Sequence, residues 1–146
     1  MGGPRRPRVL GEVESNPGKP AAKKGDKVVG TDVHVVMVPA PGGPVPTPTP
    51  MPFSGTIDAE LSPNILCESQ PLALKGSKAK NQPSHVPTGG TFQKPPSNEA
   101  TIQVGSASVF ANDKAVARSG DIALTCNDPG DLPNGVVVAT GTVIVG

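Results

Sequence analysis

The fold of this chain is decided by a short stretch that reads Gly18-Lys19-Pro20-Ala21-Ala22-Lys23-Lys24-Gly25-Asp26. Versions of it return twice at matched positions, as Gln70-Pro71-Leu72-Ala73-Leu74-Lys75-Gly76-Ser77 and Lys114-Ala115-Val116-Ala117-Arg118-Ser119-Gly120-Asp121. Gly25, Gly76 and Gly120 set the common register. A segment that recurs in this way is the signature of a repeat architecture, in which each copy forms one structural unit. Three copies therefore predict a pseudo-threefold arrangement.

The register continues upstream of the two later copies. Residues 62–67 align with residues 106–111, and each segment passes from small residues into a short apolar run. The first copy has no such run before it, but residues 140–145 carry the matching pattern at the other end of the chain. We therefore expect the C-terminal strand to complete the N-terminal unit. Closing the ring in this way also removes an exposed sheet edge.

Composition predicts a small all-β protein. Eighteen glycines and nineteen prolines among 146 residues leave few windows long enough for a helix, and the apolar segments are short and β-branched. We expect one β domain over residues 16–146 and no helix. Apolar residues make up 35% of the chain, with three Phe and neither Trp nor Tyr. A core of this kind is thin, so a metal, ring closure or a docked partner is expected to support it.

The first fifteen residues are predicted to be a flexible basic arm. This arm contains Arg5, Arg6 and Arg8 and has little to bury, although the net charge of the chain is only +1. Nucleic-acid binding is not expected, because stacking aromatics and a recognisable binding module are both missing. The sequence has no apolar run of about eighteen residues and no secretory signal pattern. We expect no stable membrane insertion and a cytoplasmic protein, unless a machine carries it out.

Two insertions interrupt the repeats. Residues 38–52 carry alternate prolines, which are expected to forbid helix and sheet-interior pairing and to give a polyproline-like strap on the surface. The alternative interpretation of this segment is a proline-rich recognition ligand. Residues 82–98 are predicted to form an irregular loop at the equivalent place in the second unit. Both insertions lie on the same side of the repeat, as is usual in repeat architectures.

The same side of the repeat carries candidate metal ligands. The chain has only two histidines and two cysteines, and three of these four residues follow the register glycines at similar distances: His34, His85 and Cys126. Threefold symmetry would bring their loops to one apex, where histidine and cysteine side chains suit a tetrahedral zinc ion. Each residue alone has a simpler interpretation, such as a packed ring at His34, an exposed loop residue at His85 and a small buried hydrophobe at Cys126.

Cys67 is a possible fourth ligand, but the alignment disfavours it. It matches Ala111 and Val145, which are strand positions just before the turn and far in sequence from the ligand loops. We interpret Cys67 as a buried free thiol, and a disulfide with Cys126 is disfavoured for the same reason and by the cytoplasmic setting. The fourth position is left to water, to a carboxylate such as Asp32 or Asp128, or to no ligand.

These motifs resemble a known family. Pro20-Ala21-Ala22-Lys23 followed by Gly25-Asp26 looks like the motif that names the PAAR-repeat proteins, and residues 106–121 resemble the longer strand-turn-strand repeat of that family. The proline-rich insertion after His34 is similar to that of a PAAR-like subgroup. The resemblance covers residues 17–146. It implies a conical β protein that caps the trimeric spike of a contractile injection machine, either a type VI secretion system or a phage-tail-like particle.

The resemblance also implies partners and a cofactor. One chain would sit on the blunt end of one spike trimer, formed by the valine-glycine repeat protein or a homologue, and aid the puncture of a target envelope. His34, His85 and Cys126 would hold one structural zinc near the apex, and the family commonly supplies four ligands, mostly histidines. The protein would assemble in the cytoplasm and leave the cell with the particle, and it could carry effectors.

Two other functional classes compete with the spike tip. An effector-binding adaptor or chaperone-like module of the same machine would use the basic arm or the strap, and it is compatible with the tip role. A small zinc hydrolase would need an open metal site and a lined pocket. The sequence has neither a His-Glu-x-x-His motif nor a deaminase-type motif. We therefore expect no enzymatic activity.

Overall fold

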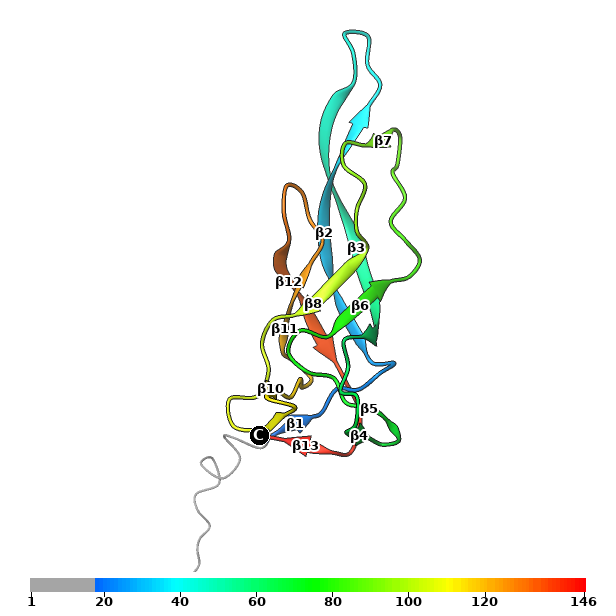
Figure 1. Ribbon diagram of the computed structural model, residues 1–146. Helices are drawn as coiled ribbons and strands as arrows, with labels where there is room; N and C mark the ends of the chain where they lie inside the picture. Colours follow the sequence, from blue (N-terminus) through cyan, green and yellow to red (C-terminus); the bar gives the residue numbers. More distant parts are fainter. Residues whose placement is uncertain (1–17) are drawn as a thin grey trace, which may run out of the picture.

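The computed structural model describes residues 18–146, which form an all-β domain without helices (Figure 1). The all-β prediction is therefore confirmed for this part of the chain. The expected basic arm, residues 1–15, lies outside the described residues. The strands are β1 (Lys19–Pro20), β2 (Lys27–Val38), β3 (Val45–Ala59), β4 (Leu66–Cys67), β5 (Gln70–Pro71), β6 (Lys78–Asn81), β7 (Thr91–Phe92), β8 (Glu99–Ile102), β9 (Phe110–Ala111), β10 (Lys114–Ala115), β11 (Ile122–Thr125), β12 (Leu132–Val138) and β13 (Ile144–Val145).

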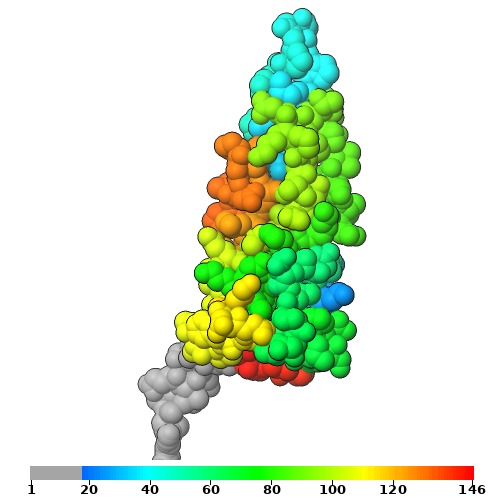
Figure 2. All heavy atoms as spheres, in the orientation of Figure 1, coloured from blue at the N-terminus to red at the C-terminus, as the bar shows by residue number. Residues whose placement is uncertain are grey.

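The molecule tapers from a broad base to a narrow tip (Figure 2). The base contains three short antiparallel pairs, β1–β13, β4–β5 and β9–β10, which we call the base hairpins, although β1 and β13 come from opposite ends of the chain. The tip is the far end of the long β2–β3 hairpin (Figure 1). Between these ends, β2, β3, β6, β8, β11 and β12 pair in that order, and β12 pairs back onto β2. This pairing closes the sheet into a small antiparallel barrel, which leaves no free edge along the paired segments.

Three hairpins at the base repeat the same backbone contacts. β13 pairs with β1 in the register Lys19↔Val145 and Pro20↔Ile144, so the C-terminal strand completes the N-terminal unit as the split repeat predicts. The turns that follow contain Gly25, Gly76 and Gly120 at φ 95°, 96° and 92°. This is a left-handed conformation that residues with a Cβ rarely adopt, which explains why glycine occupies the register position in each unit.

A closed circuit of hydrogen bonds joins the three units to one another. The amide of Ala22 donates to the carbonyl of Ala117, that of Ala117 to Ala73, and that of Ala73 to Ala22, at 2.9, 3.1 and 2.9 Å. All three alanines are fully buried. A larger side chain at these positions would hold the backbones apart and break the circuit. Alternate positions of the base hairpins point in opposite directions, and Cys67, Ala111 and Val145 point inward into one small apolar cluster.

The proline-rich segment differs from the prediction. Residues 38–52 were expected to form an unpaired polyproline-like strap, yet most of them belong to β3, which pairs with β2 without interruption from Lys27↔Thr56 to Val38↔Val45. In an antiparallel ladder, alternate residues direct their N–H groups toward the partner strand and away from it. The prolines occupy only one of these alternating sets, so the ladder with β2 needs no proline N–H. The prediction of an unpaired strap was wrong, because a strand can contain alternate prolines when their ring nitrogens face away from the partner strand.

The second insertion is mostly irregular, as expected. Residues 82–98 contain only the two-residue strand β7, which pairs with β2 in the register Val36↔Phe92 and Met37↔Thr91.

The main apolar core lies inside the barrel and includes Val28, Phe53, Ile57, Ile102 and Val137. No helix within residues 18–146 is long and apolar enough to cross a membrane.

Candidate metal centre

A cluster of polar side chains lies between the barrel and the tip, where the loop of residues 82–98 and the β11–β12 connection reach β2. The strand β2 supplies Asp32 and His34, which are two residues apart and therefore point to the same inward face. Apolar Val28 and Val36 flank them on that face. The side chains of Asp32 and His34 are 0% and 1% exposed. A carboxylate and an imidazole are costly at such a depth unless they are paired or bind a metal.

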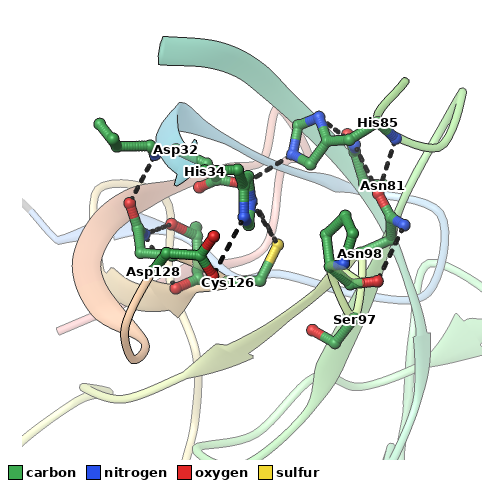
Figure 3. Close-up of polar contacts among 12 residues, drawn as sticks. Asp32, His34, Asn81, His85, Ser97, Asn98, Cys126 and Asp128 are labelled. Atoms are coloured by element: carbon green, nitrogen blue, oxygen red, sulfur yellow. Dashed lines mark hydrogen bonds and ion pairs between the residues drawn. The ribbon is translucent and has the colours of Figure 1, made fainter. Parts of the chain in front are cut away.

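Two further residues come from other parts of the chain. His85 lies in the loop after β6, and Cys126 directly follows β11. The ligand atoms of Asp32, His34, His85 and Cys126 all lie within 4.8 Å of one another (Figure 3). The structure thus brings together the three residues that the repeat register singled out and adds Asp32 to them. A buried cluster with these side chains could hold a metal ion.

Three separations within the cluster match those expected around a four-coordinate ion. Asp32 Oδ2 lies 2.8 Å from His85 Nε2, 3.3 Å from Cys126 Sγ and 3.8 Å from His34 Nε2. The fourth measured separation, from Cys126 Sγ to His34 Nε2, is 3.6 Å. Ligands bound at 2.0–2.3 Å to a tetrahedral zinc ion lie about 3.3–3.8 Å apart. Only the contact between Asp32 and His85 is shorter than this range, because a direct hydrogen bond joins the two side chains.

Two buried atoms of the cluster have no hydrogen-bond partner. They are Oδ1 of Asp32 and Nδ1 of His34. Buried polar atoms are almost always paired, so a group left unpaired in a folded protein needs an explanation. A cation held among the ligand atoms would stabilise the Asp32 carboxylate and require a protonated Nδ1 on His34. The donor set therefore fits a metal better than it fits a metal-free polar core.

The Cys126 thiol is held in its protonated form when no metal is bound. Burial, followed by the nearby negative charge of Asp32, raises the pKa of Cys126 to about 12. The sulfur also faces the backbone N–H of Asn98 and the side chain of Ser97, which act in the opposite direction by stabilising a thiolate. A metal that displaced the thiol proton would therefore find hydrogen-bond donors already directed at the sulfur.

His85 is oriented by two asparagines. Its backbone N–H donates to Asn98 Oδ1 at 2.8 Å, and its ring Nδ1 lies 3.3 Å from Asn81 Nδ2. Asn81 is fixed in turn, because its Oδ1 accepts a hydrogen bond from the amide of Ser54 on β3 at 2.9 Å. In the metal-free arrangement Nδ1 of His85 accepts a hydrogen bond from the Asn81 amide, so the ring proton is on Nε2, which donates to Asp32.

The other residues considered as ligands lie elsewhere. Cys67 is a free, buried thiol in the base cluster, and Cys126 is also free, as the sequence led us to expect. Asp128 approaches the opposite side of the His34 ring, 3.6 Å from Nδ1. Among the carboxylates proposed for the fourth position, only Asp32 therefore shares the inner side of the cluster. Its position two residues before His34 on a strand was the signal that could have selected it from the sequence.

The cluster is close to two hollows of the surface. A small cavity of about 80 Å³ is lined by His34, Cys126, Asp128, Lys94 and Asp131, among others. A groove of about 370 Å³ runs between β3 and the loop of residues 82–88 and reaches His85. The small cavity offers an entry route for an ion.

No protein-family model and no curated protein matches this chain.

Proposed function

We propose that this chain is the structural tip of a contractile injection machine, with a PAAR-like fold, and that its base caps the blunt end of a trimeric spike. The observation that carries this proposal is the outer surface of the base. Each base hairpin there presents a large apolar side chain at the same repeat position: Leu66, Phe110 and Ile144. These side chains are 65%, 60% and 55% exposed.

The residues before them reinforce the pattern. Ile65, Val109 and Val143 occupy the preceding position of each unit and are 37%, 37% and 43% exposed. Six exposed apolar side chains on three short hairpins are unusual for a free surface and indicate an interaction site.

A threefold partner suits this base. One chain with three joined units presents three similar edges, so it can contact all three subunits of a trimer at once. The blunt end of a β-helical spike has unpaired strand ends and an exposed apolar core, which such a base would cover. The taper toward the β2–β3 hairpin supports a role in sharpening the spike.

We further propose that the metal is one structural zinc ion. Two imidazoles, a thiolate and a carboxylate are all ligands that zinc accepts, and four protein ligands are typical of structural sites, whereas catalytic sites keep a position open for water. We therefore assign no catalysis to this chain. The site joins β2 to the loop of residues 82–98 and to the β11–β12 connection, so zinc would hold these three segments together.

The role in injection also defines where the protein acts. Under this proposal the chain docks on the spike in the cytoplasm and leaves the cell with the particle. The base would then be covered from assembly onward, which accounts for its apolar surface. Effector attachment would use surfaces that remain free after docking, so it does not compete with the capping role.

The experiment that tests the proposal is a binding assay with the trimeric spike protein of the organism that encodes this chain. A triple variant, Leu66→Glu, Phe110→Glu and Ile144→Glu, places a charge at the same position of each hairpin. We expect it to fold, because all three side chains are exposed, and to lose spike binding. Val86→Glu is the matched control, since Val86 is 71% exposed but lies in the loop beside the metal centre.

Spike binding by the triple variant at wild-type strength would contradict the proposed interface. Loss of binding by Val86→Glu alone would move the interface to the loops, which is the outcome expected of an adaptor that docks through its insertions. Circular dichroism and thermal unfolding of each variant establish that the fold is intact before binding is compared.

A further inference from the structure

Asp128 lies on the outer side of the His34 ring and is tied to the backbone of β2. Its own N–H donates to the carbonyl of Val33 at 2.9 Å, and its Oδ2 accepts a hydrogen bond from the N–H of Val35 at 2.8 Å. These two bonds anchor Asp128 to Val33 and Val35, the residues before and after His34. The other oxygen, Oδ1, faces Nδ1 of His34 at 3.6 Å (Figure 3).

This contact joins two buried groups, and one of them has no other partner. The side chains of His34 and Asp128 are 1% and 5% exposed. His34 Nδ1 makes no hydrogen bond, because 3.6 Å is too long for one. A free carboxylate oxygen and an unpartnered ring nitrogen therefore face each other slightly beyond bonding distance.

We propose that Asp128 is a positioning residue for the metal centre: it accepts a hydrogen bond from Nδ1–H of His34 and so directs the lone pair of Nε2 toward the metal. This inference rests on the proposed metal site, but it does not depend on the proposed spike-capping role. It assigns Asp128 a role behind His34 rather than in the metal coordination shell.

The chemistry follows from the two nitrogens of a neutral imidazole. Only one of them carries the proton, and the other is free to bind a metal. Nε2 of His34 faces Asp32 and Cys126, so a metal bound there requires the proton to be on Nδ1. A carboxylate next to Nδ1 stabilises that tautomer and makes the ring a stronger ligand, as hydrogen-bonded carboxylates do behind many metal-binding histidines. Closing the gap from 3.6 Å requires only a small movement of the ring.

Rigidity is the reason that Asp128 suits this role. A positioning group works only if its own place is fixed, and here the backbone of β2 holds Asp128 independently of the metal. The same cavity contains Lys94 and Asp131. Lys94 is directed to the carbonyl of Pro129 at 3.1 Å, so the described contacts leave Asp128 Oδ1 facing His34.

The test compares Asp128→Asn with the wild-type chain, using cobalt(II) and zinc as probes. The amide introduced by this substitution would keep an oxygen for the N–H of Val35 but would turn an NH₂ group toward His34. In the metal-free protein this NH₂ group can donate to Nδ1, so we expect the melting temperature to be unchanged or higher. In the metal-bound protein it would face Nδ1–H, donor against donor. We expect metal affinity to fall by about 10- to 100-fold.

Asp131→Asn is the matched control, because it removes a carboxylate from the same cavity without a contact to His34. It should leave metal affinity within about twofold of the wild-type value, since Asp131 is exposed and solvent screens its charge. Affinity is measured by competition with a chelator of known strength. Equal affinities for the Asp128→Asn variant and the wild-type chain would overturn the inference. So would a parallel loss of metal-free stability and affinity, because that outcome assigns Asp128 to backbone anchoring alone.

A second measurement needs no variant. In the zinc-loaded wild-type chain labelled with nitrogen-15, we expect His34 to be in the Nδ1–H tautomer, with a slowly exchanging ring proton. A ring nitrogen pattern with the proton on Nε2 would overturn the inference directly. A wild-type chain that binds neither probe would overturn both this inference and the zinc assignment, whereas the spike-binding assay would still test the capping role separately.

Discussion

The base and the tip half of this molecule are stabilised in different ways. At the base, three hairpins with strands of two residues each are joined by a circuit of backbone hydrogen bonds through Ala22, Ala73 and Ala117. The tip half consists of one long hairpin and two irregular loops, which meet at Asp32, His34, His85 and Cys126. The base therefore depends on chain closure, whereas the tip half depends on a polar cluster.

The charge distribution shows the same difference. Residues 33–57 contain no Asp, Glu, Lys or Arg, and the carboxylate contacts of this segment are those of His34 with Asp32 and Asp128. The base turns carry ion pairs in two of the three units, Lys23 with Asp26 at 3.2 Å and Arg118 with Asp121 at 2.8 Å. Ser77 replaces the acidic residue in the second unit and accepts a hydrogen bond from the N–H of Leu74. We therefore expect the stability of the base to depend less on a metal than that of the tip half.

The largest effect is expected from opening the ring at the base. Deleting residues 142–146 removes β13, leaves β1 unpaired and exposes the small cluster around Cys67. We expect cooperative unfolding to be lost, because the three units support one another and none has a core of its own. Thermal unfolding followed by circular dichroism measures this. A truncated chain with a sharp transition near the wild-type temperature would contradict closure as the source of stability.

Removing the metal should have the next largest effect, and it should be local. A chelator is expected to lower the melting temperature, since zinc at a thousand times its dissociation constant contributes about 4 kcal/mol to folding. Hydrogen exchange should increase in residues 82–98 and 126–131, while the base hairpins keep their protection. Uniform exchange throughout the chain would show that the two halves are not stabilised separately.

The two cysteines give a matched pair of substitutions. Cys126→Ala should abolish metal binding and reproduce the local exchange pattern of the chelated protein. Cys67→Ala should retain the metal and lower the free energy of unfolding by about 1 kcal/mol, the packing loss for a small buried side chain. Metal content by elemental analysis separates the two. Loss of metal from the Cys67→Ala variant would show that Cys67 takes part in the site.

The effect of pH has opposite signs for folding without metal and for metal binding. Burial and Asp32 raise the pKa of Cys126 from 9.0 to about 12, so the metal-free fold loses stability as pH rises above 9.0 toward 12. Metal binding releases the proton of the Cys126 thiol. The metal affinity of the folded chain should therefore increase about tenfold for each unit of pH while that thiol is protonated. Titrations between about pH 6 and about pH 8 test this, and a pH-independent affinity would exclude thiolate ligation by Cys126.

The sequence predicted the base better than the tip half. The repeat around Gly25, Gly76 and Gly120 was readable because each left-handed turn demands glycine, and the match of residues 140–145 predicted that β13 would pair beside the N-terminal unit. These features are set by local backbone chemistry. The tip half depends on which edge of a strand a partner uses, and that is a matter of tertiary structure.

Two residues show where the sequence was insufficient. Asp32 was one of several candidates for the fourth ligand position, and only the folded chain distinguishes it from Asp128, which reaches the same histidine from the other side. Thr47, between two prolines, looked incompatible with a sheet, yet it pairs with Val36 because the prolines direct their ring nitrogens away from β2. In both cases the decisive fact is which side of a strand a group occupies.

We propose that one chain covers one spike trimer through its apolar base. Native mass spectrometry of the complex formed with the cognate spike tests it most directly. We predict a mass equal to three spike subunits plus a single copy of this chain, with one zinc ion per complex. Three copies of this chain per trimer, or no complex at all, would contradict the account.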